Sequence, residues 1–135
     1  MKIPFYLLVV VITTGCSQDA SIDEIRQEDG LAYHIDSDQL VSADYVKRVK
    51  DKIYESGRYE NGKKVGLWQK FHNNGQVGEK SNFKNGIKEG LQEVYYDNAN
   101  LKEQETRLNG LREGALLKFY KNGAKKSEEF YSEDK

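Results

Sequence analysis

The sequence predicts an all-β protein, an elongated single-layer antiparallel β-meander built from 24-residue hairpin repeats. The main evidence for this fold is a motif that occurs three times, with starts 24 residues apart: "YENGKKVGLWQKFHNNG", "FKNGIKEGLQEVYYDNA" and "RLNGLREGALLKFYKNG". Each copy carries Asn-Gly near its start, the strongest short hairpin signal, because both residues accept the positive φ of a type I′ turn. The chain has twelve glycines and one proline, Pro4, so glycine is the expected turn residue.

Each 24-residue unit also holds a second turn signal, headed by Asn74, Asn98 or Asn122. Two turns divide the unit into two short strands of about six residues, a usual strand length. The residue after the asparagine is Gly75, Ala99 or Gly123. Because alanine disfavours the left-handed region, we expect Asn98 and Asn100 to carry the middle turn in place of Ala99.

One unit cannot bury its own apolar column, whereas stacked units share a continuous one. The repeated odd-numbered residues are therefore expected to be structural: Leu67, Phe71, Val77, Phe83, Leu91, Tyr95, Leu101 and Phe119. The even-numbered positions vary between units and are expected to form a binding face: Trp68, Lys70, His72, Val94, Tyr96, Leu116, Lys118 and Tyr120.

The best candidates for contact residues are Trp68 and the column of His72, Tyr96 and Tyr120. Trp68 stands out because its sister units carry Gln92 and Leu116 at the same position. Tryptophan and tyrosine on a half-exposed sheet suit a protein contact. The alternative is that these residues only cover the second face of a sparse sheet.

The repeat register extends back to Ile53, so we expect the repeats to occupy residues 46–135. The first of them is a degenerate half-repeat. Residues 30–45 are expected to form an opening hairpin that caps the array, since terminal repeats are commonly atypical. Its strands are predicted at residues 31–35 and 39–43, with turn chemistry at residues 36–38. Residues 16–29 are polar and predict a tether, with a short helix at residues 22–27 as the alternative.

Residues 1–15 have the layout of an export signal: a positive start at Lys2, then a mainly apolar run too short to span a bilayer. The "TTGC" that ends at Cys16 resembles the lipobox of bacterial lipoproteins. The resemblance implies cleavage before Cys16 and its lipidation. Because no aspartate follows Cys16, lipoprotein sorting in Gram-negative bacteria implies the outer membrane, facing the periplasm. A free thiol or an intermolecular bridge is the alternative for this lone cysteine.

The repeated phrase resembles the bacterial variant of the MORN repeat, Y-x-N-G-x-x-x-G followed by an aromatic pair and N-G. The resemblance covers residues 45–135 and is specific for architecture. Members of that family are often labelled antitoxin-like and many are lipoproteins. Related eukaryotic repeats are associated with membrane contact and protein assembly, so the resemblance implies a binding role.

The sequence contains no residue pattern that indicates a catalytic or cofactor-binding site. The net charge of −1 gives no field that would draw the chain to nucleic acid. His34 and His72 have no partner at a zinc-binding spacing, and the Asp-Ser-Asp at residues 36–38 lacks the ligand series of a calcium loop. We therefore expect no enzyme, no metal and no cofactor.

The sequence thus favours a lipid-anchored, non-enzymatic binding module of the bacterial envelope that engages a protein partner through its repeat sheet. One alternative is an immunity or antitoxin protein that neutralises a periplasmic toxin. Another is a structural envelope protein that binds lipid or peptidoglycan.

Overall fold

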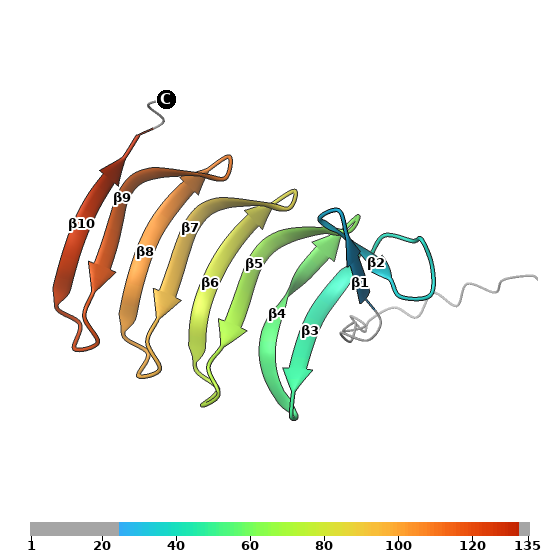
Figure 1. Cartoon of the computed structure of the whole chain (residues 1–135), viewed down its shortest axis with the longest axis horizontal. Helices are drawn as coiled ribbons and strands as arrows, with labels where there is room; N and C mark the ends of the chain where they lie inside the picture. The colour runs from blue at the N-terminus through green and yellow to red at the C-terminus, as the bar shows by residue number, and fades with distance from the viewer. Residues whose placement is uncertain (1–24, 133–135) are drawn as a thin grey trace, which may run out of the picture.

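The computed structural model describes residues 25–132, which form two antiparallel sheets (Figure 1). The larger sheet has eight strands, each paired with its neighbour in sequence. These strands are β3 (Ala43–Val49), β4 (Lys52–Glu60), β5 (Lys63–Phe71), β6 (Val77–Lys84), β7 (Ile87–Tyr95), β8 (Leu101–Leu108), β9 (Leu111–Phe119) and β10 (Lys125–Tyr131). The smaller sheet pairs β1 (Ile25–Glu28) with β2 (Leu31–His34). The predicted all-β antiparallel meander is confirmed.

The Asn-Gly pairs form the tight turns that the sequence predicts. In each of the three turns both residues have positive φ, for example 47° at Asn61 and 73° at Gly62. This is the conformation of a type I′ turn, whose twist matches that of the two strands it joins. The turns connect β4 to β5, β6 to β7 and β8 to β9.

At the second set of turns, the expectation for Ala99 is wrong, because Ala99 itself adopts the left-handed conformation with φ of 67°. Its N–H donates to Tyr96 O at 3.0 Å, and the sister residues Gly75 and Gly123 make the same bond at 2.9 Å. Asn98 supports the turn by accepting a hydrogen bond from the N–H of Asn100. The turn geometry is therefore imposed by the repeat, and the alanine is strained within it.

Replacing Ala99 by glycine is expected to raise the free energy of unfolding by about 1 kcal/mol, because glycine adopts the left-handed region without steric cost. The matched control, Gly123→Ala in the sister turn, is expected to lower it by a similar amount. Urea unfolding followed by circular dichroism measures both changes. Unchanged midpoints in the two variants would contradict the assignment of strain to this turn.

Strands β5, β7 and β9 each bend at an internal glycine: Gly66, Gly90 and Gly114, all with positive φ. At the bend in β7, residues 89–91 lie opposite Asn82 alone, between the Ser81–Gln92 and Phe83–Lys88 pairs. Figure 1 shows the three strands curving over at this end. The second glycine column thus lies inside strands of nine residues, longer than the predicted six.

Neighbouring units are joined by hydrogen bonds that recur with the repeat. The N–H of Gly86 donates to Lys64 O at 2.8 Å, and the N–H of Gly110 donates to Lys88 O at 3.0 Å. At the other end of the strands, Asn74 Nδ2 donates to Asp97 O, and Asn98 Nδ2 makes the matching bond to Lys121 O. Each unit is therefore fastened to the next at both of its ends.

The N-terminal cap differs from its prediction. Residues 25–28 form β1, which pairs with β2, so part of the predicted tether is a strand and is neither tether nor helix. The expected hairpin of residues 31–35 and 39–43 is reduced to one bridge between Tyr33 and Leu40, with flanking hydrogen bonds. Strand β2 therefore pairs along its length with β1, which precedes it, and not with the predicted return strand that follows it.

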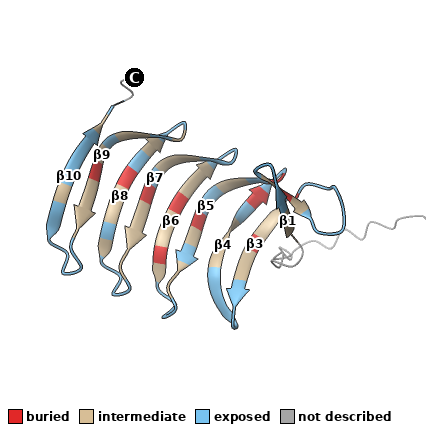
Figure 2. Cartoon of the chain, in the orientation of Figure 1, coloured by how far each residue is buried: buried red, intermediate tan, exposed pale blue. Residues whose placement is uncertain are grey.

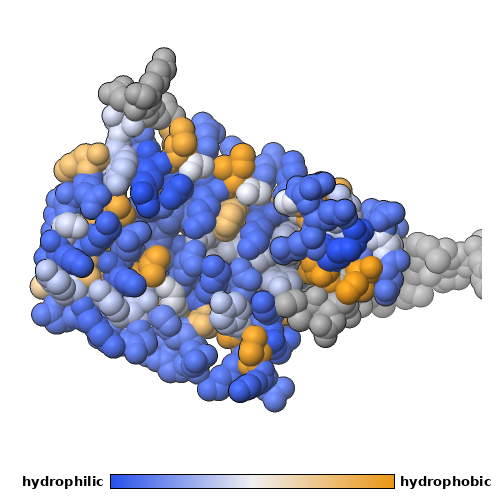
Figure 3. All heavy atoms as spheres, in the orientation of Figure 1, coloured by the Kyte–Doolittle hydropathy of each residue, from blue (hydrophilic) through white to orange (hydrophobic). Residues whose placement is uncertain are grey.

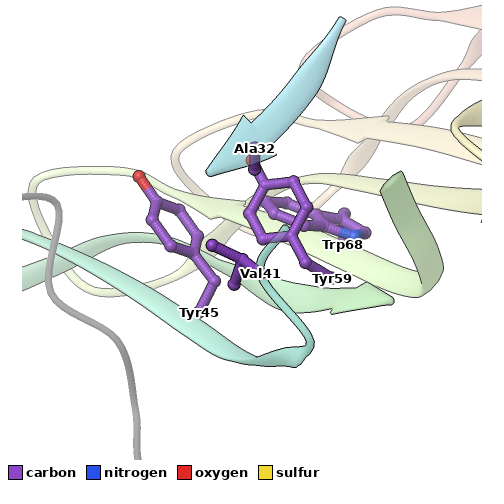
Figure 4. Close-up of a cluster of buried hydrophobic side chains, with 5 residues drawn as sticks. All are labelled: Ala32, Val41, Tyr45, Tyr59 and Trp68. Atoms are coloured by element: carbon purple, nitrogen blue, oxygen red, sulfur yellow. The ribbon is translucent and has the colours of Figure 1, made fainter. Parts of the chain in front are cut away.

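The cap occupies the place of a preceding repeat. Val41 O accepts the N–H of Gly62 at 2.8 Å, the role that Lys64 O plays for Gly86 one unit later. Ala32 and Val41 are fully buried against Tyr45, Tyr59 and Trp68 (Figure 4). The largest apolar cluster of the described residues therefore lies where the cap meets the first strands, and other buried positions follow along successive strands (Figure 2).

Candidate binding groove

One face of the large sheet carries a row of buried side chains across its strands. Cross-strand partners share a face, and the pairs Trp68–Ser81, Ser81–Gln92 and Gln92–Glu105 run from β5 to β8. Leu116 continues the row on β9. We call this side the Trp68 face, and its central row consists of Trp68, Ser81, Gln92, Glu105 and Leu116. Every member is at least nine-tenths buried.

The predicted assignment of the two faces is wrong for β5, β7 and β9, whereas Phe83 on β6 packs against the core as predicted. Leu67 and Leu91, expected to be structural, are 48% and 39% exposed, whereas Trp68 and Leu116, expected on the open face, are 3% and 2% exposed. Alternation holds along each strand, but parity switches between strands, because even-numbered Trp68 and Gln92 share their face with odd-numbered Ser81 and Glu105. The enclosed side is the one that carries Trp68, Gln92 and Leu116, on the same strands that bend at internal glycines.

Trp68 is a core residue and not an exposed contact residue. Its ring packs against Tyr59 at a centroid distance of 4.9 Å and against Tyr45 at 5.5 Å. Its Nε1 donates to Arg58 O at 3.2 Å, and Lys64 Nζ lies 3.8 Å from the ring centroid. Burial raises the pKa of the neighbouring Tyr59 hydroxyl to about 12. These contacts leave the indole no surface to offer a partner.

Gly57 makes room for the indole ring. A Cβ on Gly57 would lie 2.6 Å from Trp68 Cγ and closer still to other ring carbons. Tyr45 is the cross-strand partner of Gly57, so the indole fills the space above a strand that has no side chain at this point. The position of the Trp68 ring therefore depends on a glycine at position 57 of β4.

The predicted contact column of His72, Tyr96 and Tyr120 has a role at the junctions between units. His72 Nε2 lies 3.0 Å from Tyr95 O, and Tyr96 Oη donates to Phe119 O at 2.9 Å. Each bond links one unit to the next at the same repeat position. Tyr120, in the last unit, is 51% exposed. The structure therefore places this column away from Trp68 and gives its first two members a structural function.

Two charged columns repeat along the groove on the Trp68 face, and sequence reasoning missed both. Glutamate recurs at positions 55, 79 and 103, and a cation recurs at positions 64, 88 and 112. Members of a column stand two strands apart, which is about 10 Å. Lys64 Nζ contacts Glu55 Oε1 at 3.2 Å, and Lys88 Nζ contacts Glu79 Oε1 at 3.5 Å. The 24-residue period of these charges was the available signal.

The carboxylates of this groove are held in the charged form. For Glu79, burial opposes ionisation, but hydrogen bonds from Lys70 and Ser81 outweigh it and keep the pKa below its ordinary value. For Glu105, burial is likewise outweighed, here by hydrogen bonds from Arg112 and Arg107 that lower the pKa. Arg107 Nε lies 2.6 Å from Glu105 Oε1. The groove therefore presents fixed charges of both signs.

Two recesses make up the groove. A small one of about 80 Å³ lies beside Trp68, and one of about 210 Å³ lies over Gln92 and Glu105. They share Glu79, Ser81 and Lys88, so they lie side by side. The face of the molecule seen in Figure 3 is largely hydrophilic with isolated apolar side chains. Such a polar, charge-patterned groove can position charged or hydrogen-bonding groups of a ligand.

A separate, more apolar recess lies near the far end of β4 and β5. It has a volume of about 380 Å³ and is lined by Ile53, Tyr54, Phe71 and His72, among others. Ile53 and Tyr54 are 43% and 44% exposed. Of the four predicted contact residues, His72 alone lines this recess, and Trp68 alone lines the groove.

Cys16, the predicted lipidation site, and the predicted signal at residues 1–15 lie outside the described residues. Between residues 25 and 132, no helix has the length and apolar character needed to cross a bilayer. Over the same range, no three His, Cys, Asp or Glu side chains gather as a set of metal ligands.

Comparison with protein-family models, curated proteins and solved structures gives no match to this chain. The resemblance of the repeats to the MORN variant and of residues 13–16 to a lipobox therefore stays a prediction.

Proposed function

We propose that the chain is a lipid-anchored, non-enzymatic binding module of the bacterial envelope, which engages a protein partner through the groove on the Trp68 face. The observation that carries the proposal is the groove itself. Two columns of opposite charge flank a buried row in which the side-chain oxygen of Gln92 accepts no hydrogen bond from the described residues. A partner with matching charges satisfies such a surface and is selected by it.

A protein surface suits the length of this groove. The glutamate column spans β4 to β8 and the cation column spans β5 to β9. At about 4.8 Å between strands, each column extends over about 20 Å. That span exceeds a single small molecule and matches a segment of a protein interface. The anchor rests on the lipobox resemblance at Cys16, and the polar residues that follow it give the module reach from the membrane.

Crosslinking the full chain in its own host and recovering it from the membrane fraction tests the proposal. We expect one envelope protein to be enriched, quantified by mass spectrometry. Lys88→Glu reverses a charge that lines both recesses, and is expected to lower recovery of that protein about tenfold or more. Lys84→Glu, at an exposed position beside the β6–β7 turn, makes the same charge change outside the groove as a control.

If Lys88→Glu and Lys84→Glu recover the partner protein equally, the groove is not the binding site. Retention on purified cell wall without a protein partner would favour a structural envelope role, and a toxin as partner would make the chain an immunity protein. In the same host, Cys16→Ser is expected to move the chain out of the membrane fraction. A processed Cys16→Ser chain that stays in the membrane pellet contradicts the lipid anchor.

A further inference from the structure

The orientation of the Gln92 amide is fixed by its neighbours. Gln92 Nε2 donates to Asn82 O at 3.1 Å and to Gly90 O at 3.2 Å. Both acceptors are backbone carbonyls, so the nitrogen and not the oxygen must face them. The oxygen Oε1 therefore points the other way. It is buried and accepts no hydrogen bond from any described residue, although Gln92 is only 4% exposed.

The repeat explains why a recess lies over this residue. Trp68, 24 residues earlier, donates from Nε1 to Arg58 O, and Gln92 donates to Asn82 O, the carbonyl 24 residues after Arg58. The two side chains thus make the same bond from the same position. The amide is much smaller than the indole. The recess measures about 80 Å³ beside Trp68 and about 210 Å³ over Gln92, which we call the Gln92 pocket.

The charges that line the Gln92 pocket differ in how far they are already paired. Both oxygens of Glu105 contact Arg107 or Arg112, and Glu79 contacts Lys70, Lys88 and Ser81. Glu103 also lines the pocket, and it has no ion pair with any described residue. It stands opposite Val94, two positions along β7 from Gln92. Glu93 lies on the opposite face of β7, so Gln92 Oε1 and Glu103 are the groups on the Trp68 face of the pocket that lack a donor, and both are acceptors.

We propose that the Gln92 pocket binds an arginine side chain of the protein partner. The guanidinium donates to Gln92 Oε1 and to the Glu103 carboxylate. A guanidinium carries donors and no acceptor, so it meets both unsatisfied groups and adds no new one. On the Trp68 face the pocket is lined by three carboxylates and three cations, and the Glu103 carboxylate that has no ion pair favours a cation over an anion. The inference rests on the proposed function and names the group that the partner inserts.

Titration of the full chain with Nα-acetylarginine amide tests the site directly, followed by nitrogen-15 NMR of the glutamine side-chain amides. The expected result is a saturable shift of the Gln92 amide signal. The citrulline analogue, which has the same shape without the charge, is expected to bind about tenfold more weakly. Equal binding of the two compounds, or no shift at Gln92, overturns the proposal.

Two variants and a matched control separate the site from general effects. Gln92→Leu installs the residue that Leu116 already supplies at this repeat position, and is expected to weaken arginine binding about tenfold or more. Glu103→Gln is expected to remove most of the preference for arginine over citrulline. Gln104→Leu makes the same change as Gln92→Leu on β8, at a position that does not line the pocket, and is expected to leave binding unchanged.

The outcomes also distinguish this inference from the proposed function. If the chain recovers a protein partner and Gln92→Leu recovers it equally, the arginine pocket is wrong and the binding module stands. If Gln92 responds to arginine but crosslinking recovers no protein partner, the pocket stands and the proposed function falls. Arginine binding that persists in Gln92→Leu rejects the pocket, whatever the partner experiment gives.

Discussion

Replacing Trp68 by alanine is expected to lower the free energy of unfolding by about 3–5 kcal/mol, the usual cost of deleting a large buried aromatic side chain. The change removes the ring contacts with Tyr45 and Tyr59 and leaves Arg58 O without its indole donor. Lys64 also loses the ring over which its ammonium lies. Since the same cluster seats the cap, the loss extends to β1 and β2.

The measurement is urea unfolding followed by far-ultraviolet circular dichroism, because the variant has no tryptophan to report by fluorescence. Leu67→Ala, one residue away on the exposed side, is the matched control, and its unfolding midpoint is expected to change little. A Trp68→Ala chain as stable as the parent, but defective in partner binding, would restore Trp68 to the contact surface.

Replacing Gly57 by alanine is expected to cost about 1–3 kcal/mol, the usual range for overpacking a filled site. The added methyl group overlaps the indole ring of Trp68, so either the ring or strand β4 must move. Gly57 has no positive φ, and the cost therefore comes from space and not from backbone strain. The same unfolding measurement applies, with intrinsic tryptophan fluorescence as a second readout of the displaced ring.

A double variant isolates this mechanism. In a Trp68→Ala background the space above Gly57 is open, so Gly57→Ala is expected to cost much less than it does alone. The difference between the two costs is the coupling energy of the pair. Additive effects of the two changes would show that Gly57 acts through something other than the indole.

The sequence was sufficient to predict the meander because its turn chemistry repeats at a fixed interval. Asn61-Gly62 and its copies specify tight hairpins by backbone preference alone, independently of packing. At Ala99 the propensity of the single residue predicts the wrong turn conformation, because hydrogen bonds of the flanking residues fix the turn. The sequence does not predict the pairing of the cap, because β1 has only four residues, too few to show a clear alternating pattern.

The enclosed face could not be predicted from alternation. Alternation tells which residues of one strand share a side, but it does not tell which side is buried. The same strands bend at Gly66, Gly90 and Gly114, whose role as bends within strands is set by long-range pairing. The series Trp68, Gln92 and Leu116 at one repeat position is visible in the sequence, where it predicts a contact residue. Its meaning changed once the position proved to be internal: the smaller residue opens a pocket, and the larger one fills it.

The hydrogen bonds from each unit to the next have a consequence for how the fold opens. Such contacts join nearest neighbours, so stability along an array of this kind approximates a sum of local terms. The aromatic cluster and the cap lie on the first strands, whereas β10 offers Phe130 at 77% exposure and pairs only with β9 within the described residues. Resistance to local unfolding is therefore graded from one end to the other. Strand β10 therefore separates first, and the groove between Trp68 and Gln92, which no β10 residue lines, stays folded.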